Sequence, residues 1–121
     1  MTPATARAPQ KIDQTLAALA DPSRRGVIDL LRKRPRRAGE LAEALALSAQ
    51  AMSRHLRVLR QAGLVEEGES DAPDDARVRV YQLRRQPFAS LRQWTEEVEA
   101  FWGAQLGAFA AHVEKRGRER K

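Results

Sequence analysis

Cysteine is absent from the 121 residues, and histidine occurs twice. The absence of thiols excludes disulfides, cysteine-ligated zinc, iron–sulfur clusters and any thiol switch. Two histidines make a multi-histidine metal centre hard to build, so we expect no metal site and no cofactor. No apolar run approaches the roughly 18 residues of a membrane span, and the first ten residues lack the apolar block of a signal peptide. These absences predict a soluble, cytoplasmic, single-domain protein.

The usual signatures of catalysis are missing as well. The chain has no GxGxxG or Walker-type loop, and neither histidine has an evident carboxylate partner in the sequence. The acidic residues between positions 66 and 75 lack the spacing of an EF-hand loop. We therefore expect that the protein is not an enzyme.

What the chain does have is an uneven distribution of charge. Residues 1–63 contain 12 Lys and Arg against 5 Asp and Glu, whereas residues 64–121 contain 10 against 11. All of the excess positive charge therefore lies in the first half, which favours a polyanion such as nucleic acid as the partner of one face. The alternative is a solvated, arginine-rich surface. The basic run at residues 32–37 is open to the same two interpretations, a contact to phosphates or a solvated turn.

The first half of the chain predicts four helices. Apolar residues at helical spacing, separated by turn-forming residues, place them at residues 10–20, 23–33, 40–47 and 49–62. Asp21 and Pro22 mark the start of the second helix, Ser48 is a good N-cap for the fourth, and Gly63 ends it. Two helices joined by three or four residues, the second properly capped, form the outline of a helix-turn-helix.

After the fourth helix the pattern changes from helical to alternating. Residues 64–67 and 77–83 are β-like, and the stretch 68–76 between them, rich in Gly, Asp, Ser and Pro, predicts a long loop in a hairpin. Pro87 opens a final helix of roughly 27 residues. The predicted fold class is mainly α with a small β-hairpin, in the order α-α-α-α-β-β-α.

The same patterns predict how the chain is divided. Residues 1–9 lack periodicity and are interpreted as a flexible N-terminal arm. Residues 10–114 form the predicted folded domain, in which residues 87–114 are the C-terminal dimerisation helix. Residues 115–121 are interpreted as a frayed basic tail.

One side of the predicted fourth helix is polar and free of acid. Its apolar arc contains Met52, His55, Leu56, Leu59 and Ala62. The opposite arc contains Gln50, Arg54, Arg57 and Gln61, with Ser53 and Arg60 at its edges. No carboxylate lies between Ser48 and Gly63, so the guanidinium groups repel one another unless an anion lies against them. Because Arg and Gln also match the edges of guanine and adenine, the pattern predicts a DNA recognition helix; an exposed polar helix is the alternative.

The predicted second strand repeats this theme. Arg77 and Arg79 alternate with valines, so both side chains leave one face of the strand, in position to straddle phosphates beside the groove. The residues before them are acidic: Glu66, Glu67, Glu69, Asp71, Asp74 and Asp75. We expect this acidic loop either to lie clear of a duplex or to weaken non-specific binding.

A broad apolar stripe follows the last helix. It contains Leu91, Trp94, Val98, Phe101, Trp102, Leu106, Phe109 and Val113. A small domain cannot cover so long a helix unaided, so the stripe predicts a dimer interface. A ligand pocket lined by Trp94 and Trp102 is the alternative.

In several blocks the sequence resembles the ArsR/SmtB family of bacterial winged helix-turn-helix repressors. The resemblance spans residues 16–83 and rests on LADPSRR (19–25), GELA (39–42), LSAQAMSRHLRVL (47–59) and QAGLV (61–65). It implies recognition-helix contacts from Ser48, Gln50, Ser53, Arg54 and His55, joined by Arg57, and wing contacts from Arg77 and Arg79. For His55, a half-buried histidine with a structural role is an equal alternative.

The resemblance also implies a homodimer in which the first and last helices pair. The residues expected in that interface are Ile12, Leu16, Leu91, Trp94, Val98, Phe101, Trp102, Leu106 and Phe109. It further implies that the dimer binds an operator in a promoter and that a signal releases repression.

The sequence departs from the metal-sensing members of that family. The positions of their cysteine-rich run at the start of the third helix hold Arg37, Gly39 and Glu40, and the last helix offers His112 and Glu114, which do not share a face. A cysteine-free member that does not sense metal is therefore expected. Arg37 also stands at the N-cap of the third helix, where relatives often have Ser or Thr, which predicts a small loss of helix stability.

The predicted function is a sequence-specific DNA-binding transcriptional regulator, a homodimeric repressor of a pseudo-palindromic operator. Its expected partners are double-stranded DNA and a second copy of the chain, with no membrane; a small-molecule effector is left open and unidentified. The alternative is a winged-helix module for protein–protein contact that has lost DNA binding, which the acidic loop favours.

Overall fold

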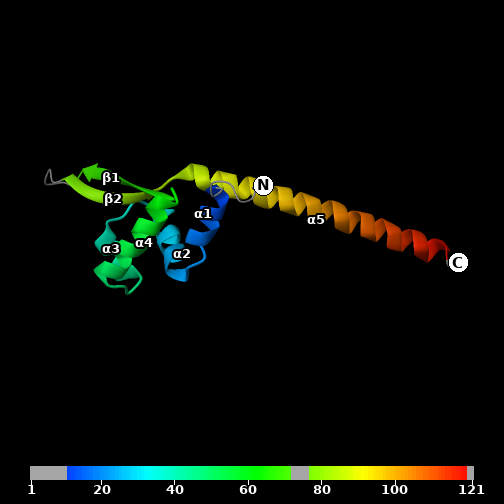
Figure 1. Cartoon of the computed structure of the whole chain (residues 1–121), viewed down its shortest axis with the longest axis horizontal. Helices are drawn as coiled ribbons and strands as arrows, with labels where there is room; N and C mark the ends of the chain where they lie inside the picture. Colours follow the sequence, from blue (N-terminus) through cyan, green and yellow to red (C-terminus); the bar gives the residue numbers. More distant parts are fainter. Residues whose placement is uncertain (1–10, 72–76, 120–121) are drawn as a thin grey trace, which may run out of the picture. The chain divides into compact units, whose positions relative to one another are not determined.

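The computed structural model describes residues 11–71 and 77–119, and for residues 70, 71, 77, 118 and 119 the backbone alone. These residues form five helices and one antiparallel hairpin in the predicted order (Figure 1). The elements are α1 (Lys11–Ala18), α2 (Pro22–Leu31), α3 (Ala38–Ala44), α4 (Ala49–Gln61), β1 (Val65–Asp71), β2 (Arg77–Leu83) and α5 (Arg85–Glu119). The chain divides into two compact units, one ending at Phe88 and the other beginning at Ala89.

The core of the first unit is built from the apolar faces that the periodicity predicts. Helix α4 lies against α2, α3 and β1. The buried cluster contains Ala18, Val27, Leu31, Leu41, Ala42, Met52, Leu56, Leu59, Leu64 and Val65. Because three residues of α4 lie in this cluster, burial of apolar surface holds the opposite, polar arc of α4 toward solvent.

Side-chain caps start two of the helices where the sequence predicts. The Asp21 carboxylate accepts hydrogen bonds from the backbone N–H groups of Ser23 (2.7 Å) and Arg24 (3.1 Å), and Pro22 occupies the first helical position of α2. At α4, the Ser48 hydroxyl oxygen accepts from the N–H of Ala51 at 3.1 Å. Each cap satisfies N–H groups that have no partner within the helix.

Left-handed residues end both helices of the helix-turn-helix. Gly63 follows α4 with φ at 77°, as its predicted role requires. Ala46 follows α3 with φ at 55°, so the prediction that this helix reaches residue 47 is wrong. A left-handed residue turns the chain out of the helix, and α3 therefore ends at Ala44.

The hairpin is longer than predicted. Strand β1 runs to Asp71 in register with β2, from Val65 opposite Leu83 to Asp71 opposite Arg77, so the loop predicted at 68–76 is wrong for its first four residues. The β-branched residues of β2 supply a partner edge, and pairing across strands outweighs the weak strand preference of this stretch. Residues 72–76, with the predicted contributions of Asp74 and Asp75, lie outside the described residues.

The last helix is also longer than the predicted residues 87–114. It begins at Arg85, so that Pro87 falls in the first turn, where a missing N–H costs no helical hydrogen bond. At its other end, residues 115–119 continue the helix, which corrects the expected fraying of this part of the tail. None of the helices in the described ranges combines the length and apolar character needed to cross a membrane.

Candidate nucleic-acid interface

The outer arc of α4 presents exposed polar side chains with no acid among them. Gln50, Ser53, Arg54 and Arg57 are all exposed. Within the part of the chain that the structure describes, Arg54 and Arg57 form no ion pair or hydrogen bond through their side chains, whereas Arg60 pairs with Glu67. Two neighbouring guanidinium groups without a counter-charge are suited to binding an anion.

Ser48 has a structural role at the start of this arc. Its hydroxyl oxygen caps α4, and the hydroxyl hydrogen remains able to donate to an acceptor outside the protein. The cap is confirmed, and the DNA contact stays a prediction.

His55 is half-buried between α4 and α2. Its Nδ1 lies 3.4 Å from Arg24 Nη1, and because arginine can only donate, Nδ1 accepts and Nε2 holds the hydrogen. Arg24 also donates to the carbonyl of Ala18 at 2.6 Å. This geometry favours the structural alternative for His55, and its DNA contact stays a prediction.

The same junction stabilises the negative charge of Asp21. Hydrogen bonds from the backbone N–H groups of Arg24 and Ser23 hold the pKa of the Asp21 carboxyl below its ordinary value, with a smaller contribution from the charge of Arg24. The junction thus joins the start of α2 to α4.

In the wing, formed by β1 and β2, acidic and basic side chains pair with one another. Glu67 accepts a hydrogen bond from Tyr81 and forms ion pairs with Arg60 and Arg79. The sequence-based prediction counted Glu67 with an acidic loop and gave it no partner, whereas pairing residue 71 with residue 77 places Glu67 opposite Tyr81. Arg77 begins β2, and its side chain lies outside what the structure describes.

A groove of about 550 Å³ separates the end of α4 from β1. It is lined by Arg57, Arg60, Gln61, Val65, Glu66, Glu67 and Arg84. Arg84 Nε lies 3.8 Å from a Glu66 carboxylate oxygen. Three arginines and two carboxylates thus line the groove, which joins the polar surface of α4 to the wing.

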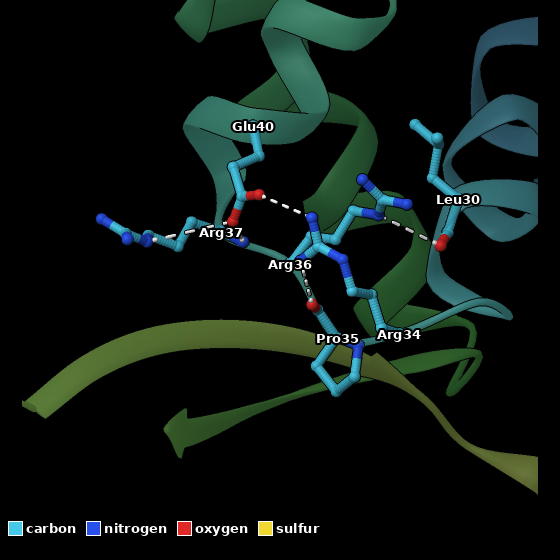
Figure 2. A network of polar contacts seen from close by, with 6 residues as sticks. All are labelled: Leu30, Arg34, Pro35, Arg36, Arg37 and Glu40. Carbon is cyan, nitrogen blue, oxygen red and sulfur yellow. Dashed lines mark hydrogen bonds and ion pairs between the residues drawn. The ribbon is translucent and has the colours of Figure 1, made fainter. Parts of the chain in front are cut away.

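The basic run at residues 32–37 is partly bound within the protein (Figure 2). Arg34 Nη2 lies 3.2 Å from Glu40, the N–H of Arg37 donates to the same carboxylate at 3.1 Å, and Arg36 Nε donates to the carbonyl of Leu30 at 3.2 Å. These contacts favour the structural interpretation of the run. The N–H of Arg37, followed by the Arg34 guanidinium, lowers the pKa of Glu40.

Glu40 also contributes to the N-terminal cap of α3. Arg37 occupies the N-cap and its side chain makes no cap hydrogen bond, as predicted. Glu40, three residues later, accepts from the N-cap N–H instead, which is half of a capping box. The expected loss of stability is therefore partly offset.

The apolar stripe of α5 is exposed in the single chain. Trp94 is 44% exposed, Trp102 58% and Phe109 66%. The rings of Phe101 and Trp102 meet edge to face, with centroids 6.0 Å apart. On α1, Leu16 is 42% exposed, and Ile12 is half-buried.

Among the residues that the structure describes, no three side chains of the metal-ligating types come together.

Comparisons with known proteins agree with this geometry. A family model described as a helix-turn-helix domain matches residues 19–68. The chain is 38% identical over 105 residues to the HTH-type transcriptional regulator Rv2034 of Mycobacterium tuberculosis, covering 87% of this chain and 91% of that protein. It is 34% identical over 56 residues to the transcriptional repressor SdpR of Bacillus subtilis, and the match covers 46% of this chain and 62% of SdpR.

A solved structure supports the same assignment. The ArsR-like transcriptional regulator from Rhodococcus sp. RHA1 superposes with a TM-score of 0.68 at 27% identity, covering 82% of this chain and 89% of that one. The extent of the match to Rv2034 and the shared fold place this protein among transcription regulators and not among enzymes. The chain belongs to the ArsR family of winged helix-turn-helix, DNA-binding transcriptional regulators.

Proposed function

We propose that the protein is a homodimeric repressor whose α4 enters the major groove of a pseudo-palindromic operator. The observation that supports this most is the outer arc of α4, where Arg54 and Arg57 are exposed and without partners among the described residues. Met52, Leu56 and Leu59 fix the opposite arc in the core. The helix can therefore present this surface to DNA without unfolding.

The roles of the side chains follow from their chemistry. Arg54 and Gln50, with paired donors or acceptors, are assigned to base edges. Further DNA contacts from α4, beside those of Arg54 and Gln50, are assigned to Ser48, Ser53, His55 and Arg57. Contacts to phosphates beside the groove are assigned to Arg77 and Arg79. The positive first half of the chain supplies affinity that falls steeply with salt.

The apolar stripe supports the proposal of a second copy. Val98, Phe101, Trp102, Leu106 and Phe109 are each more than a third exposed on α5, and an unpaired surface of this kind favours association. We expect the two recognition helices of a two-fold dimer paired through α1 and α5 to bind half-sites about one helical turn, roughly 34 Å, apart. The interface residues proposed are Ile12, Leu16, Leu91, Trp94, Val98, Phe101, Trp102, Leu106 and Phe109.

Repression is proposed because a bound dimer excludes other proteins from the promoter it covers. The relative SdpR is named a transcriptional repressor. An operator that overlaps the promoter produces repression, whereas one upstream of it allows activation. No effector is assigned.

The test is selection of fragments of the source genome that the full chain binds, followed by titration of the best fragment and of a random duplex at two salt concentrations. We expect an inverted repeat, with specific binding about 10³-fold or more tighter than random binding. A protein-interaction module would instead select no common sequence and bind both duplexes weakly. That result would overturn the proposal.

A further inference from the structure

Glu67 is the point at which the recognition helix and both strands of the wing meet. Its Oε1 accepts a hydrogen bond from the Tyr81 hydroxyl at 3.0 Å and lies 3.0 Å from Arg60 Nη1. Its Oε2 lies 3.4 Å from Arg79 Nε. One carboxylate therefore binds groups from β2 and from the last turn of α4.

The Glu67 carboxylate is more buried than the two guanidinium groups that it pairs with. Its side chain is 25% exposed, against 51% for Arg60 and 73% for Arg79, and a partly buried carboxylate is screened less by water and salt. Burial and the neighbouring Glu67 carboxylate raise the pKa of Tyr81, so the hydroxyl remains a donor at neutral pH. The register places Glu67 directly opposite Tyr81 and diagonal to Arg79 on one face of the hairpin.

We propose that Glu67 is a specificity-determining positioning residue, which withholds Arg60 from DNA phosphates and orients Arg79. This inference rests on the proposed function. Arg60 stands at the edge of the acid-free arc of α4, next to the exposed Arg57 in the groove between α4 and β1. Its Nη1 is held by the carboxylate, whose negative charge offsets that of the guanidinium, so a phosphate gains less from binding Arg60.

This arrangement mainly affects the affinity for DNA of arbitrary sequence. Non-specific affinity comes from phosphate contacts, each of which changes the slope of log K against log salt by about 0.9. Arg60, whose Nη1 lies 3.0 Å from the carboxylate, therefore contributes little to that slope, whereas Arg79 pairs through Nε at 3.4 Å and keeps both terminal nitrogens for a phosphate. Glu67 thus lowers affinity for random duplexes, while base-reading residues such as Arg54 retain their effect on the operator.

The experiment compares the full chain with Glu67→Gln on the selected operator and on a random duplex across a salt series. We expect the variant to bind the random duplex about 3- to 10-fold more tightly, with a slope steeper by about 1. The ratio of specific to random binding falls accordingly. Glu43→Gln is the matched control, because Glu43 is exposed on α3 and its side chain forms no ion pair or hydrogen bond within the described ranges. The Glu43→Gln substitution removes the same charge and should change the slope of log K against log salt little.

Two further variants separate charge from wing packing. Arg60→Gln alone should leave random binding near the wild-type value, and combined with Glu67→Gln it should cancel the gain. Tyr81→Phe removes the hydroxyl hydrogen bond but keeps both ion pairs, so the slope should stay unchanged.

Several outcomes overturn the inference. One is weaker random binding by Glu67→Gln; another is an equal gain from Glu43→Gln, and a third is a loss of slope from Arg60→Gln in the wild-type background. The Arg60→Gln arm remains decisive if Glu67→Gln fails to fold. If the wild-type chain itself shows no preference for a sequence, the proposed function fails, which is a distinct result.

Discussion

Ala46 and Gly63 occupy the same position, directly after the C-cap, in the two helices of the helix-turn-helix. Both have positive φ, at 55° and 77°. In each case the N–H of the following residue donates to the carbonyl five residues earlier at 2.9 Å, which is the Schellman pattern. The same backbone geometry therefore fixes the turn before α4 and the turn after it, although one position is glycine and the other is not.

This pair predicts opposite effects of exchanging glycine and alanine. Ala46→Gly should raise the free energy of unfolding by roughly 0.5–1 kcal/mol, because it removes the cost of a side chain in the left-handed region. Gly63→Ala should lower it by about 1–2 kcal/mol for the same reason. A Cβ at Gly63 would lie 3.6 Å from Arg84 Nη1, an ordinary contact, so the loss is conformational. Urea unfolding followed by circular dichroism measures both.

Gly39→Ala is the control for these exchanges. Gly39 lies within α3, and a Cβ there has nothing within 4 Å. The substitution should stabilise the protein by up to about 1 kcal/mol, since alanine loses less backbone freedom than glycine on entering a helix. If Gly39→Ala and Gly63→Ala changed the free energy of unfolding in the same direction, the role assigned to the backbone at Gly63 would be contradicted.

The faces and ends of α4 were predictable because they depend on local sequence. Met52, Leu56 and Leu59 repeat at helical spacing, and Ser48 and Gly63 are residue types whose own chemistry starts or stops a helix. These signals place the polar arc without knowledge of the rest of the fold.

The features that could not be predicted from the sequence depend on contacts between residues distant in the chain. Strand β1 continues past Glu67 because β2 pairs with it, and the Arg60–Glu67 ion pair exists because the hairpin folds back beside α4. Ala46 is left-handed although alanine does not favour that conformation, so no local signal indicated where α3 ends. Tertiary contacts decide such positions.

The lowered pKa values of Asp21 and Glu40 predict loss of stability in acid. A carboxyl whose pKa is lower in the folded state contributes stability above its unfolded pKa, here near the ordinary 3.8 and 4.5, and loses it as pH falls through the folded pKa. We expect the thermal midpoint to be flat near neutral pH and to fall below about pH 4. Asp21→Asn keeps a cap without the charge and should reduce this dependence. An unchanged acid profile would contradict the cause assigned to it.

Arg54→Ala should relax sequence preference. Removing a base contact costs on the order of 1–3 kcal/mol of operator binding, and the loss on random DNA is smaller. Arg57→Ala, at the neighbouring exposed guanidinium, is the matched comparison, and it should weaken binding to both duplexes and reduce the salt slope by about 1. Fluorescence anisotropy with operator and random duplexes measures both. Equal losses on the two duplexes for Arg54→Ala would exclude base reading by this residue.

Trp102→Glu should dissociate the dimer and abolish operator binding. Trp102 is 58% exposed in the single chain and contacts Phe101 edge to face, so a carboxylate there places a charge within the stripe that the second copy is proposed to cover. Ala104→Glu is the control, because at 100° per residue position 104 lies on the opposite side of α5. Sedimentation velocity should give a monomer for Trp102→Glu and a dimer for Ala104→Glu. If Trp102→Glu sediments as the wild type does, the stripe is not the interface, and the half-site spacing proposed from it loses its basis.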